Sequence, residues 1–329
     1  MPTNKKPVLE PTTQSYIDAI VAQGGKPIYK LSYADAREVL ENLQAGPVTK
    51  LPADVEDKTL PVGPTGEVPV TIYRPKNSTG PLPVVMYFHG GGWILGSKRT
   101  HDRLLRDLVN QVNAAFVFVT YTPSPEAQFP VPIEQAYAAT KYIAEHAREF
   151  GLDASRLAVA GDSVGGNMTA AVTLLAKERK GPPILYQVML YPVTDASLNT
   201  GSYRQYANGP WLTKNAMKWF WDAYAPKKSD RKKITASPLL ATLQQLKGLP
   251  PALLIVDEND VLRDEGEAYA QKLAKAGVNV TAIRMLGTFH DFAMLNGLAE
   301  TPATKAAIEL AGRKLSIALE TQKRAAAAG

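Results

Sequence analysis

The segment LAVAGDSVGG, residues 157–166, places Ser163 between a short apolar run and a stretch of helical character that begins near Asn167. A strand followed by a sharp turn and a helix is the context in which a Gly-x-Ser-x-Gly sequence presents a nucleophilic serine. The turn is strained, so the neighbours of the serine must be small, and Gly161 and Gly165 meet that need. The helix N-terminus behind the serine also favours negative charge in front of it. The segment therefore predicts a serine nucleophile, and the alternative is a glycine-rich turn with an idle serine.

A second glycine motif, HGGGW at residues 89–93, directly follows another apolar run. Ester hydrolysis passes through a tetrahedral oxyanion that needs preorganised N–H donors, and a glycine loop lets bare backbone approach the developing charge. We expect the N–H groups of Gly90, Gly91 and Val164 to bind the oxyanion, with Gly92 as a further candidate. A phosphate-binding loop is the competing interpretation, but the sequence has neither a Gly-x-Gly-x-x-Gly nor a Walker motif.

A serine nucleophile needs a base, and the chain has four histidines. His89 belongs to the glycine loop, and we interpret His101 and His146 as surface or capping residues. His290 follows the last predicted strand, residues 280–285, so that it comes after the serine and after the acid. This is the chain order of α/β enzymes with a Ser-His-acid triad, and it makes His290 the expected base.

The acid that orients the base is expected just after the strand predicted at residues 252–256. Asp260 suits this role best, because it lies in a loop several residues past the strand and before a helix. Asp257 is the main rival. We interpret Asp264 and Glu265 as N-cap and first-turn residues of the next helix.

The remaining pattern predicts an α/β fold with a mostly parallel central sheet flanked by helices. Near-continuous apolar runs are typical of strands that are buried on both faces. Strands that alternate with helices along the chain indicate the α/β class. The predicted strands are residues 68–73 (alternating and half-buried), 84–88, 115–119, 157–160, 186–191, 252–256 and 280–285, and the predicted helices are two within 12–45 and one each within 133–150, 168–180, 215–225 and 265–276, with Thr213 as a possible N-cap and Gly151 as a terminating glycine.

Residues 195–240 interrupt this alternation and hold three of the four tryptophans. We expect this stretch and residues 1–45 to form a helical cap over a catalytic core of residues 46–194 and 241–320, all within one domain spanning 1–329. Trp93, Trp211, Trp219 and Phe289 are expected to wall a substrate pocket. The basic run at 227–233 is interpreted as a solvated loop.

Composition narrows the classes of function. The chain has 329 residues and no cysteine, which excludes a disulfide framework, a cysteine zinc site and a thiol nucleophile. With 37 basic and 31 acidic residues, the net charge of +6 is interpreted as an aid to solubility, and no nucleic-acid partner is expected. The N-terminus lacks an apolar signal region and no window reaches 18 apolar residues, so we expect a cytoplasmic location without membrane insertion.

Taken together, HGGGW, GDSVGG, the DVLRDEG segment at 260–266 and the late His290 resemble the hormone-sensitive-lipase-like branch of the α/β hydrolases, the bacterial family IV esterases. The resemblance covers residues 60–320, and it implies that the aspartate that opens DVLRDEG, Asp260, completes the triad. There are two departures: YTPSPE at 121–126 lacks the arginine and leucine of the family's Tyr-Arg-Leu-Ala-Pro-Glu segment, and Val164 stands where the family usually has alanine.

The residues and the resemblance together predict a serine carboxylesterase for small esters with short- to medium-chain acyl groups. Ser163 would attack the acyl carbonyl, His290 would take its proton and return it to the alcohol, and Asp260 would hold the histidine in the required tautomer. No metal or organic cofactor is expected, and a homodimer is possible. The alternatives are an amidase or acyltransferase with the same triad, or a non-catalytic ligand-binding relative.

Overall fold

An eight-stranded sheet lies at the centre of the computed structural model, which describes residues 7–327. The strand order is β1-β2-β4-β3-β5-β6-β7-β8, with antiparallel pairing at β1–β2 and β2–β4 and parallel pairing elsewhere. The predicted α/β class with a mostly parallel sheet is therefore confirmed. The strands are β1 Ala53–Leu60, β2 Val68–Pro75, β3 Leu82–Phe88, β4 Ala115–Val119, β5 Leu152–Asp162, β6 Gln187–Leu190, β7 Ala252–Asn259 and β8 Val280–Phe289.

The apolar runs identify the inner strands, but both edges of the sheet differ from expectation. At the parallel edge, none of residues 280–285 of β8 is buried, although an apolar run predicts burial on both faces. Strand β1 was not predicted, because its sequence ADVEDKTL is polar and most of its residues are exposed at the sheet edge. Strand β2 was predicted to be half-buried, but six of its eight residues are buried. The reason is that β1 covers its outer edge while α3 packs against it, an arrangement that the alternation in sequence does not reveal.

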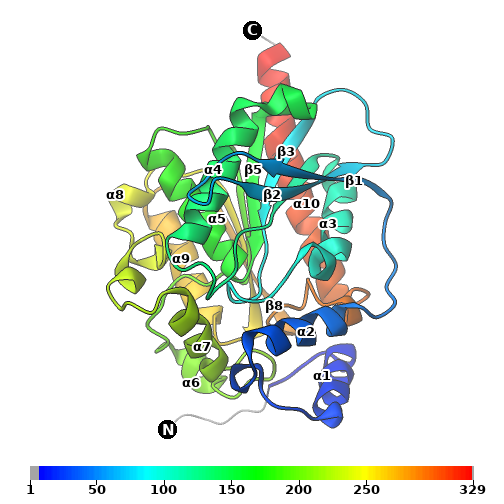
Figure 1. Cartoon of the computed structure of the whole chain (residues 1–329), viewed down its shortest axis with the longest axis vertical. Coiled ribbons are helices and arrows are strands. Elements are labelled where there is room, and N and C mark those ends of the chain that lie inside the picture. Colours follow the sequence, from blue (N-terminus) through cyan, green and yellow to red (C-terminus); the bar gives the residue numbers. More distant parts are fainter. Residues whose placement is uncertain (1–6, 328–329) are drawn as a thin grey trace.

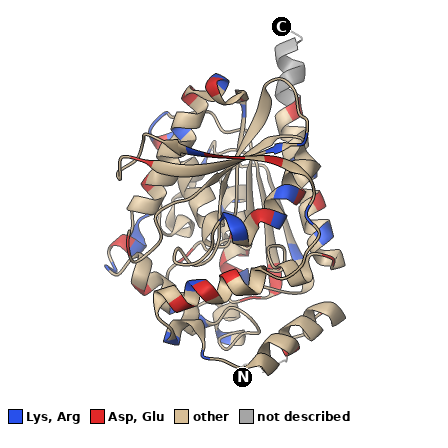
Figure 2. Cartoon of the chain, turned by 45° about the vertical axis from the view of Figure 1, so that its right-hand side comes forward, with Lys and Arg blue, Asp and Glu red and all other residues tan. Residues whose placement is uncertain are grey.

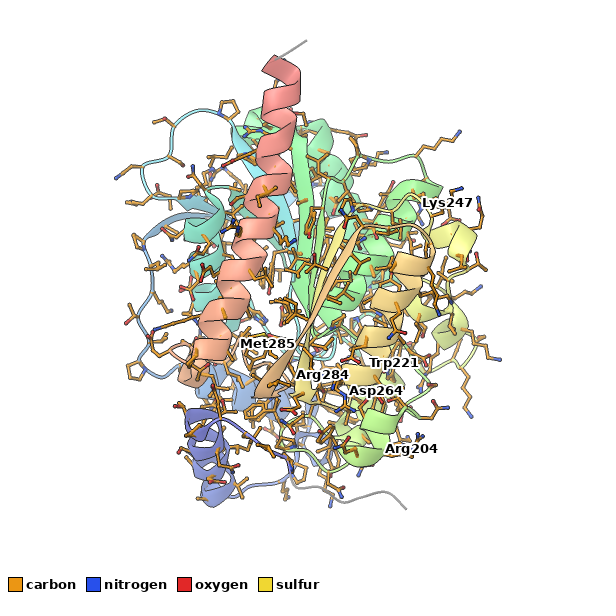
Figure 3. The ribbon with its side chains drawn as sticks, turned by 180° about the vertical axis from the view of Figure 1, so that it is seen from behind. Arg204, Trp221, Lys247, Asp264, Arg284 and Met285 are labelled. Atoms are coloured by element: carbon orange, nitrogen blue, oxygen red, sulfur yellow. The ribbon has the colours of Figure 1, made fainter. Side chains whose placement is uncertain are left out.

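The helices cover both faces of the sheet, with α3 and α10 on one side and α4, α5 and α9 on the other (Figure 1). Figure 3, viewed from the back of Figure 1, shows α10 in front of the sheet. The predicted helices are found, and α3, α6, α8 and α10 are additional. The helices are α1 Pro11–Gln23, α2 Tyr33–Gln44, α3 Lys98–Val112, α4 Val131–Glu145, α5 Val164–Glu178, α6 Gly201–Gln205, α7 Lys214–Tyr224, α8 Leu243–Leu246, α9 Arg263–Lys275 and α10 Pro302–Ala327, with single 3₁₀ turns at Ile28–Lys30, Ala147–Phe150, Asp230–Lys232, Pro238–Leu240 and Asn296–Leu298.

Local signals for two helix ends were correct. Thr213 caps α7, because its side-chain oxygen accepts the N–H of Ala216. Gly151 ends the 3₁₀ turn after α4 with a left-handed φ of 64°. Asp264 is not an N-cap as predicted, since α9 begins at Arg263, two residues earlier than expected, and Leu262 occupies the cap position. The loop between β7 and α9 is therefore shorter than the positions of Asp264 and Glu265 indicated.

Residues 7–45 and 195–240 of the two segments expected to form the cap lie together at one end of the molecule, where Figure 1 shows α1, α2, α6 and α7; residues 1–6 of the predicted cap lie outside the described residues. Trp219 of α7 stacks on Tyr33 at the start of α2, with ring centroids 5.2 Å apart. Arg37 of α2 pairs with Glu126 at 2.7 Å and donates to the carbonyl of Ile94 in the core. Segments far apart in sequence therefore meet each other and the core at this end.

Charged residues of both signs are interspersed over the side shown in Figure 2, and neither sign covers a continuous face there. The basic run within 227–233 is largely exposed, as expected of a solvated loop. Its Arg231 is tied back to Asp222 at 2.8 Å. No helix within residues 7–327 combines the length and the apolar character needed to cross a membrane.

A buried arginine anchors the segment that follows the last strand. Arg103 of α3 is 2% exposed, and its Nη2 donates to the carbonyls of Ala293 and Met294 at 2.7 Å each and of Leu295 at 3.3 Å. A buried carbonyl without a hydrogen-bond partner is costly, and Arg103 supplies the donor to the carbonyl of Ala293. It adds a second donor to the carbonyls of Met294 and Leu295, which also accept from Gln44 Nε2 and from the N–H of Leu298. Helix α3 thereby holds the chain just beyond the predicted catalytic base.

Replacing Arg103 should therefore destabilise the fold. We expect Arg103→Met to lower the free energy of unfolding by about 2 kcal/mol, because the buried carbonyl of Ala293 loses its donor and Asp107 loses its ion-pair partner. Urea unfolding would measure this. Arg99→Met, an exposed arginine of the same helix, is the control and should change stability by no more than about 0.5 kcal/mol. Equal effects of the two changes would contradict the anchoring role.

Candidate active site

Ser163 occupies the sharp turn between β5 and α5, with a φ of 55° and a ψ of −119°. Two glycines allow this turn because the backbone passes very close to its neighbours. A side chain at Gly161 would collide with the carbonyl of Gly165, and one at Gly165 would collide with the carbonyl of Phe88 in β3. The GDSVGG motif is thus a packing requirement of the strand–turn–helix junction, as the sequence predicts.

The structure brings the three predicted triad residues into one hydrogen-bonded chain. His290 Nε2 lies 2.9 Å from Ser163 Oγ, and His290 Nδ1 lies 2.8 Å from Asp260 Oδ2. The side chains come from the turn after β5, the loop after β7 and the residue that follows β8. Their exposed fractions are 4%, 1% and 3% for Ser163, Asp260 and His290, so the group is almost closed to solvent. A serine, an imidazole and a carboxylate at these distances can carry out acyl transfer.

The rival acid, Asp257, does not orient the histidine. It is fully buried, and neither of its carboxylate oxygens has a hydrogen-bond partner among the described residues. Burial raises its pKa well above the ordinary value, and the nearby Asp260 and Asp291 raise it further. Glu265 serves the fold, because its carboxylate accepts the N–H groups of Thr194 and Asp195.

One group of three potential metal ligands occurs within the described part of the chain: Asp257, Asp260 and His290, with ligand atoms within 4.8 Å of one another. In this group His290 Nδ1 and Asp260 Oδ2 already face each other at hydrogen-bond distance. The arrangement thus matches an imidazole held by a carboxylate better than a metal centre.

One predicted oxyanion donor in the glycine loop has to be corrected. The N–H of Gly90 donates to Asp162 Oδ1 at 3.1 Å, so Gly90 is engaged inside the protein and is not a donor to the oxyanion. Within residues 7–327, no hydrogen bond from the N–H of Gly91, Gly92 or Val164 is present. Gly91 and Gly92 have φ values of 106° and 65°, and a side chain on Gly92 would overlap the ring of Phe220. These three N–H groups remain the candidate donors.

Sequence reasoning missed the carboxylate that holds this loop. Asp162, the residue before the serine, accepts hydrogen bonds from the Tyr87 hydroxyl at 2.7 Å and from Gly90, and lies 3.2 Å from His101 Nε2. His101 is fully buried and the cap of α3 is Ser97, so the interpretation of His101 as a surface or capping residue was wrong. Helix α3 carries it beneath the loop, and its sequence context, a polar segment, gave no signal of this. His146 does lie at the surface end of α4, beside Glu149.

The Asp162–His101 pair is a buried ion pair. Burial works against each charge, but Asp162 raises the pKa of His101 above its ordinary value. In turn, burial would raise the pKa of Asp162, whereas His101 and the Tyr87 hydroxyl lower it. His89 is different, since burial and the neighbouring His101 lower its pKa to about 3 and keep it neutral. A charged pair and a neutral histidine thus support the glycine loop from behind.

The predicted aromatic pocket residues have different environments. Trp93 is fully buried and stacks on Tyr224 with centroids 3.9 Å apart, so its ring is part of the packing between the glycine loop and α7 rather than an exposed wall. Phe289 is also fully buried, with its ring 5.9 Å from that of Trp211. Trp211 and Trp219 are partly buried. Trp211 additionally donates its Nε1 proton to Asp291 Oδ2 at 3.0 Å.

Two carboxylates control the charge of His290, the predicted catalytic base. Burial alone would lower the pKa of His290, but Asp260 at its Nδ1 side and Asp291 at its Nε2 side outweigh burial and raise it to about 9. Asp291 Oδ1 lies 3.4 Å from Nε2. The protonated imidazole, which forms when serine gives up its proton, is therefore stabilised before any substrate binds.

Comparison with known proteins agrees with this geometry. The family model for the alpha/beta hydrolase fold matches residues 85–294, and the chain belongs to this family. It is 35% identical over 285 residues to carboxylesterase NlhH of Mycobacterium tuberculosis, covering 85% of this chain and 87% of that protein. It is 35% identical over 302 residues to ethyl acetate hydrolase of Pseudomonas putida, covering 89% and 94% respectively.

Among solved structures, a thermostable esterase from Pseudomonas putida ECU1011 is 51% identical, with a TM-score of 0.94 over 96% of this chain and 99% of that one. The relatives support the hormone-sensitive-lipase-like resemblance seen in the motifs. Within the family, the chain is a carboxylic ester hydrolase.

The raised pKa of His290 has a consequence for the pH dependence of activity. A general base must be neutral, and kcat/KM reports the ionisation of the free enzyme. As pH rises through the pKa of His290, the neutral fraction increases, so kcat/KM for an uncharged ester should rise with a midpoint above 6.5, the ordinary histidine value. A pH–rate profile measures this, and a midpoint at or below 6.5 would contradict the proposed charge environment.

Proposed function

We propose that the protein hydrolyses esters through an acyl-enzyme formed on Ser163. Serine Oγ attacks the acyl carbonyl carbon while His290 Nε2 takes its proton. The tetrahedral oxyanion is bound by N–H groups of Gly91, Gly92 and Val164, and it collapses as the imidazolium returns the proton to the departing alcohol. Water then attacks the acyl-enzyme by the same route. The observation that carries this proposal is the continuous Ser163–His290–Asp260 chain, at 2.9 and 2.8 Å.

The acyl group that we propose is short to medium in length. The ring of Phe220 lies against the α-carbon of Gly92, and the branched Val164 side chain is fully buried beside the serine. Both reduce the space beside the candidate oxyanion donors. The relative named ethyl acetate hydrolase acts, by its name, on an ester with a two-carbon acyl group, which supports the same size class.

We further propose that residues 1–45 and 195–240 act as a cap over a core of residues 46–194 and 241–320. The Tyr33–Trp219 stack joins the two cap segments, and the Trp211–Asp291 hydrogen bond joins the cap to the residue after the catalytic histidine. The nearly complete burial of Ser163 supports a cover that restricts access. The cytoplasmic location and the homodimer expected from the sequence stay predictions.

Two alternatives share parts of this arrangement. An amidase or acyltransferase would use the same triad, so the geometry alone does not separate it from an esterase. A non-catalytic relative would have lost a triad member, and here all three are present with hydrogen bonds between them. The esterase relatives favour ester hydrolysis over both alternatives.

Removal of the nucleophile is the direct test. We expect Ser163→Ala to lower kcat for a short aryl ester by at least about 10³-fold, because the covalent route is lost while binding groups remain. Circular dichroism and urea unfolding would show that the fold is intact. Ser15→Ala, an exposed serine of α1, should retain full activity. Full activity in Ser163→Ala would refute the assignment.

A matched substrate series tests the acyl size and the type of bond. Aryl esters of increasing acyl length should give a maximum of kcat/KM among short and medium chains, because Phe220 and Val164 limit the space. A maximum at long-chain triglycerides would contradict this limit.

Turnover of an ester and of the amide with the same acyl group should favour the ester, and faster amide turnover would favour the amidase alternative.

A further inference from the structure

The residue after the catalytic histidine carries a carboxylate that the triad does not use. Asp291 Oδ1 lies 3.4 Å from His290 Nε2, the same nitrogen that faces Ser163 Oγ. Its other oxygen, Oδ2, accepts a hydrogen bond from Trp211 Nε1 at 3.0 Å. The carboxylate is therefore held between the reacting face of the histidine and an indole of the cap segment 195–240.

Several buried polar atoms in this region have no hydrogen-bond partner in the described chain. Among them are the Asp291 Oδ1 oxygen, the hydroxyl of Tyr16 on α1 and the hydroxyl of Tyr191, whose ring packs against His290. Burial and the negative charge of Asp291 raise the pKa of Tyr16 to about 12. Buried polar groups are normally hydrogen-bonded, so Asp291 Oδ1 has an unused capacity to accept a hydrogen bond beside His290.

The backbone at Asp291 is held in a conformation that glycine adopts more readily. Its φ is 70°, in the left-handed region, and its carbonyl accepts the N–H groups of Met294 and Leu295 at 2.8 and 3.0 Å. Glycine would make this turn without strain, whereas aspartate and asparagine are tolerated there. The turn itself does not need a carboxylate, which leaves the position of the charge beside His290 as its distinctive effect.

The proposed mechanism determines which part of the substrate meets this charge. His290 Nε2 must pass a proton to the oxygen of the departing alcohol, so that oxygen comes within hydrogen-bond reach of Nε2. Asp291 Oδ1 is 3.4 Å from the same nitrogen. Groups on the first carbons of the alcohol therefore lie close to the carboxylate.

We propose that Asp291 selects the alcohol portion of the ester. The site would favour alcohols that carry a cationic or hydrogen-bond-donating group near the ester oxygen, and it would discriminate against alcohols that carry a carboxylate there. Charges a few ångströms apart in a site that excludes most water interact much more strongly than in bulk solvent. This inference rests on the proposed function, because it requires His290 to serve the leaving alcohol.

The test compares acetates in which only the charge of the alcohol differs. Acetylcholine is compared with its uncharged isostere 3,3-dimethylbutyl acetate, and acetoxyacetate is compared with acetoxyacetamide. At low ionic strength, we expect the wild-type protein to have a higher kcat/KM for the cation than for its isostere, and a lower one for the anion than for its amide. Each preference should be about tenfold.

Asp291→Asn keeps an oxygen that can accept the Trp211 N–H, and it removes the charge. We expect it to abolish most of both preferences and to raise kcat/KM for acetoxyacetate relative to acetoxyacetamide by about tenfold. Asp291→Gly suits the left-handed backbone and provides a second variant if the first folds poorly. It should change the cation-to-isostere and anion-to-amide ratios of kcat/KM in the same directions as Asp291→Asn does. Asp18→Asn, an exposed acid of α1, makes the same change in net charge and should leave both ratios unchanged.

The outcomes separate the inference from the function on which it rests. If the wild-type protein hydrolyses the neutral acetates but shows no charge preference, or if Asp291→Asn alters charged and neutral esters equally, Asp291 acts only on His290 or on the fold, and the inference is wrong. If the neutral acetates and short aryl esters are not hydrolysed at all, the proposed function fails instead.

Discussion

The close approach of two backbones at the carboxyl ends of β3 and β5 is the constraint on which the rest of the site depends. The chain can turn through Ser163 with a positive φ only because nothing larger than glycine stands at Gly165, against the carbonyl of Phe88. The same adjacency puts the glycine loop after β3 next to the serine after β5, where Asp162 binds the N–H of Gly90. Nucleophile and oxyanion loop are thus held by one junction between neighbouring parallel strands.

Buried carboxylates around this junction have different tasks because their neighbours differ. Asp162 is paired with His101 and holds the loop, while Asp260 is paired with His290 and orients the base. Asp257 has no partner, so burial raises its pKa well above the ordinary value. Asp291 lies on the reacting side of the histidine and is held by the cap through Trp211. The same functional group therefore positions backbone, orients a base or presents charge to a substrate, according to what surrounds it.

Much of the fold could be predicted because its signals are local. Apolar runs identified the inner strands, and GDSVGG, with a strand before it and a helix after it, indicated the serine turn. Strand β1 was missed because an exposed edge strand with the sequence ADVEDKTL carries no apolar pattern. His101 was misplaced because its partner lies 61 residues away, and no local pattern signals a pairing across that distance.

The sequence by itself determined the α/β class, and it predicted the serine nucleophile and the histidine that could serve it, because these predictions follow from short motifs and from the choice among four histidines. Only the tertiary structure decided that Gly90 is engaged by Asp162, that Asp260 rather than Asp257 meets His290, and that Asp291 faces the reacting nitrogen. The physical reason is that a hydrogen bond depends on where two atoms lie in space, and the partners come from separate strands and loops. The spacing of residues along one helix or strand indicates which face of that element a side chain lies on. Which side chain of another element it contacts depends on how the elements pack together.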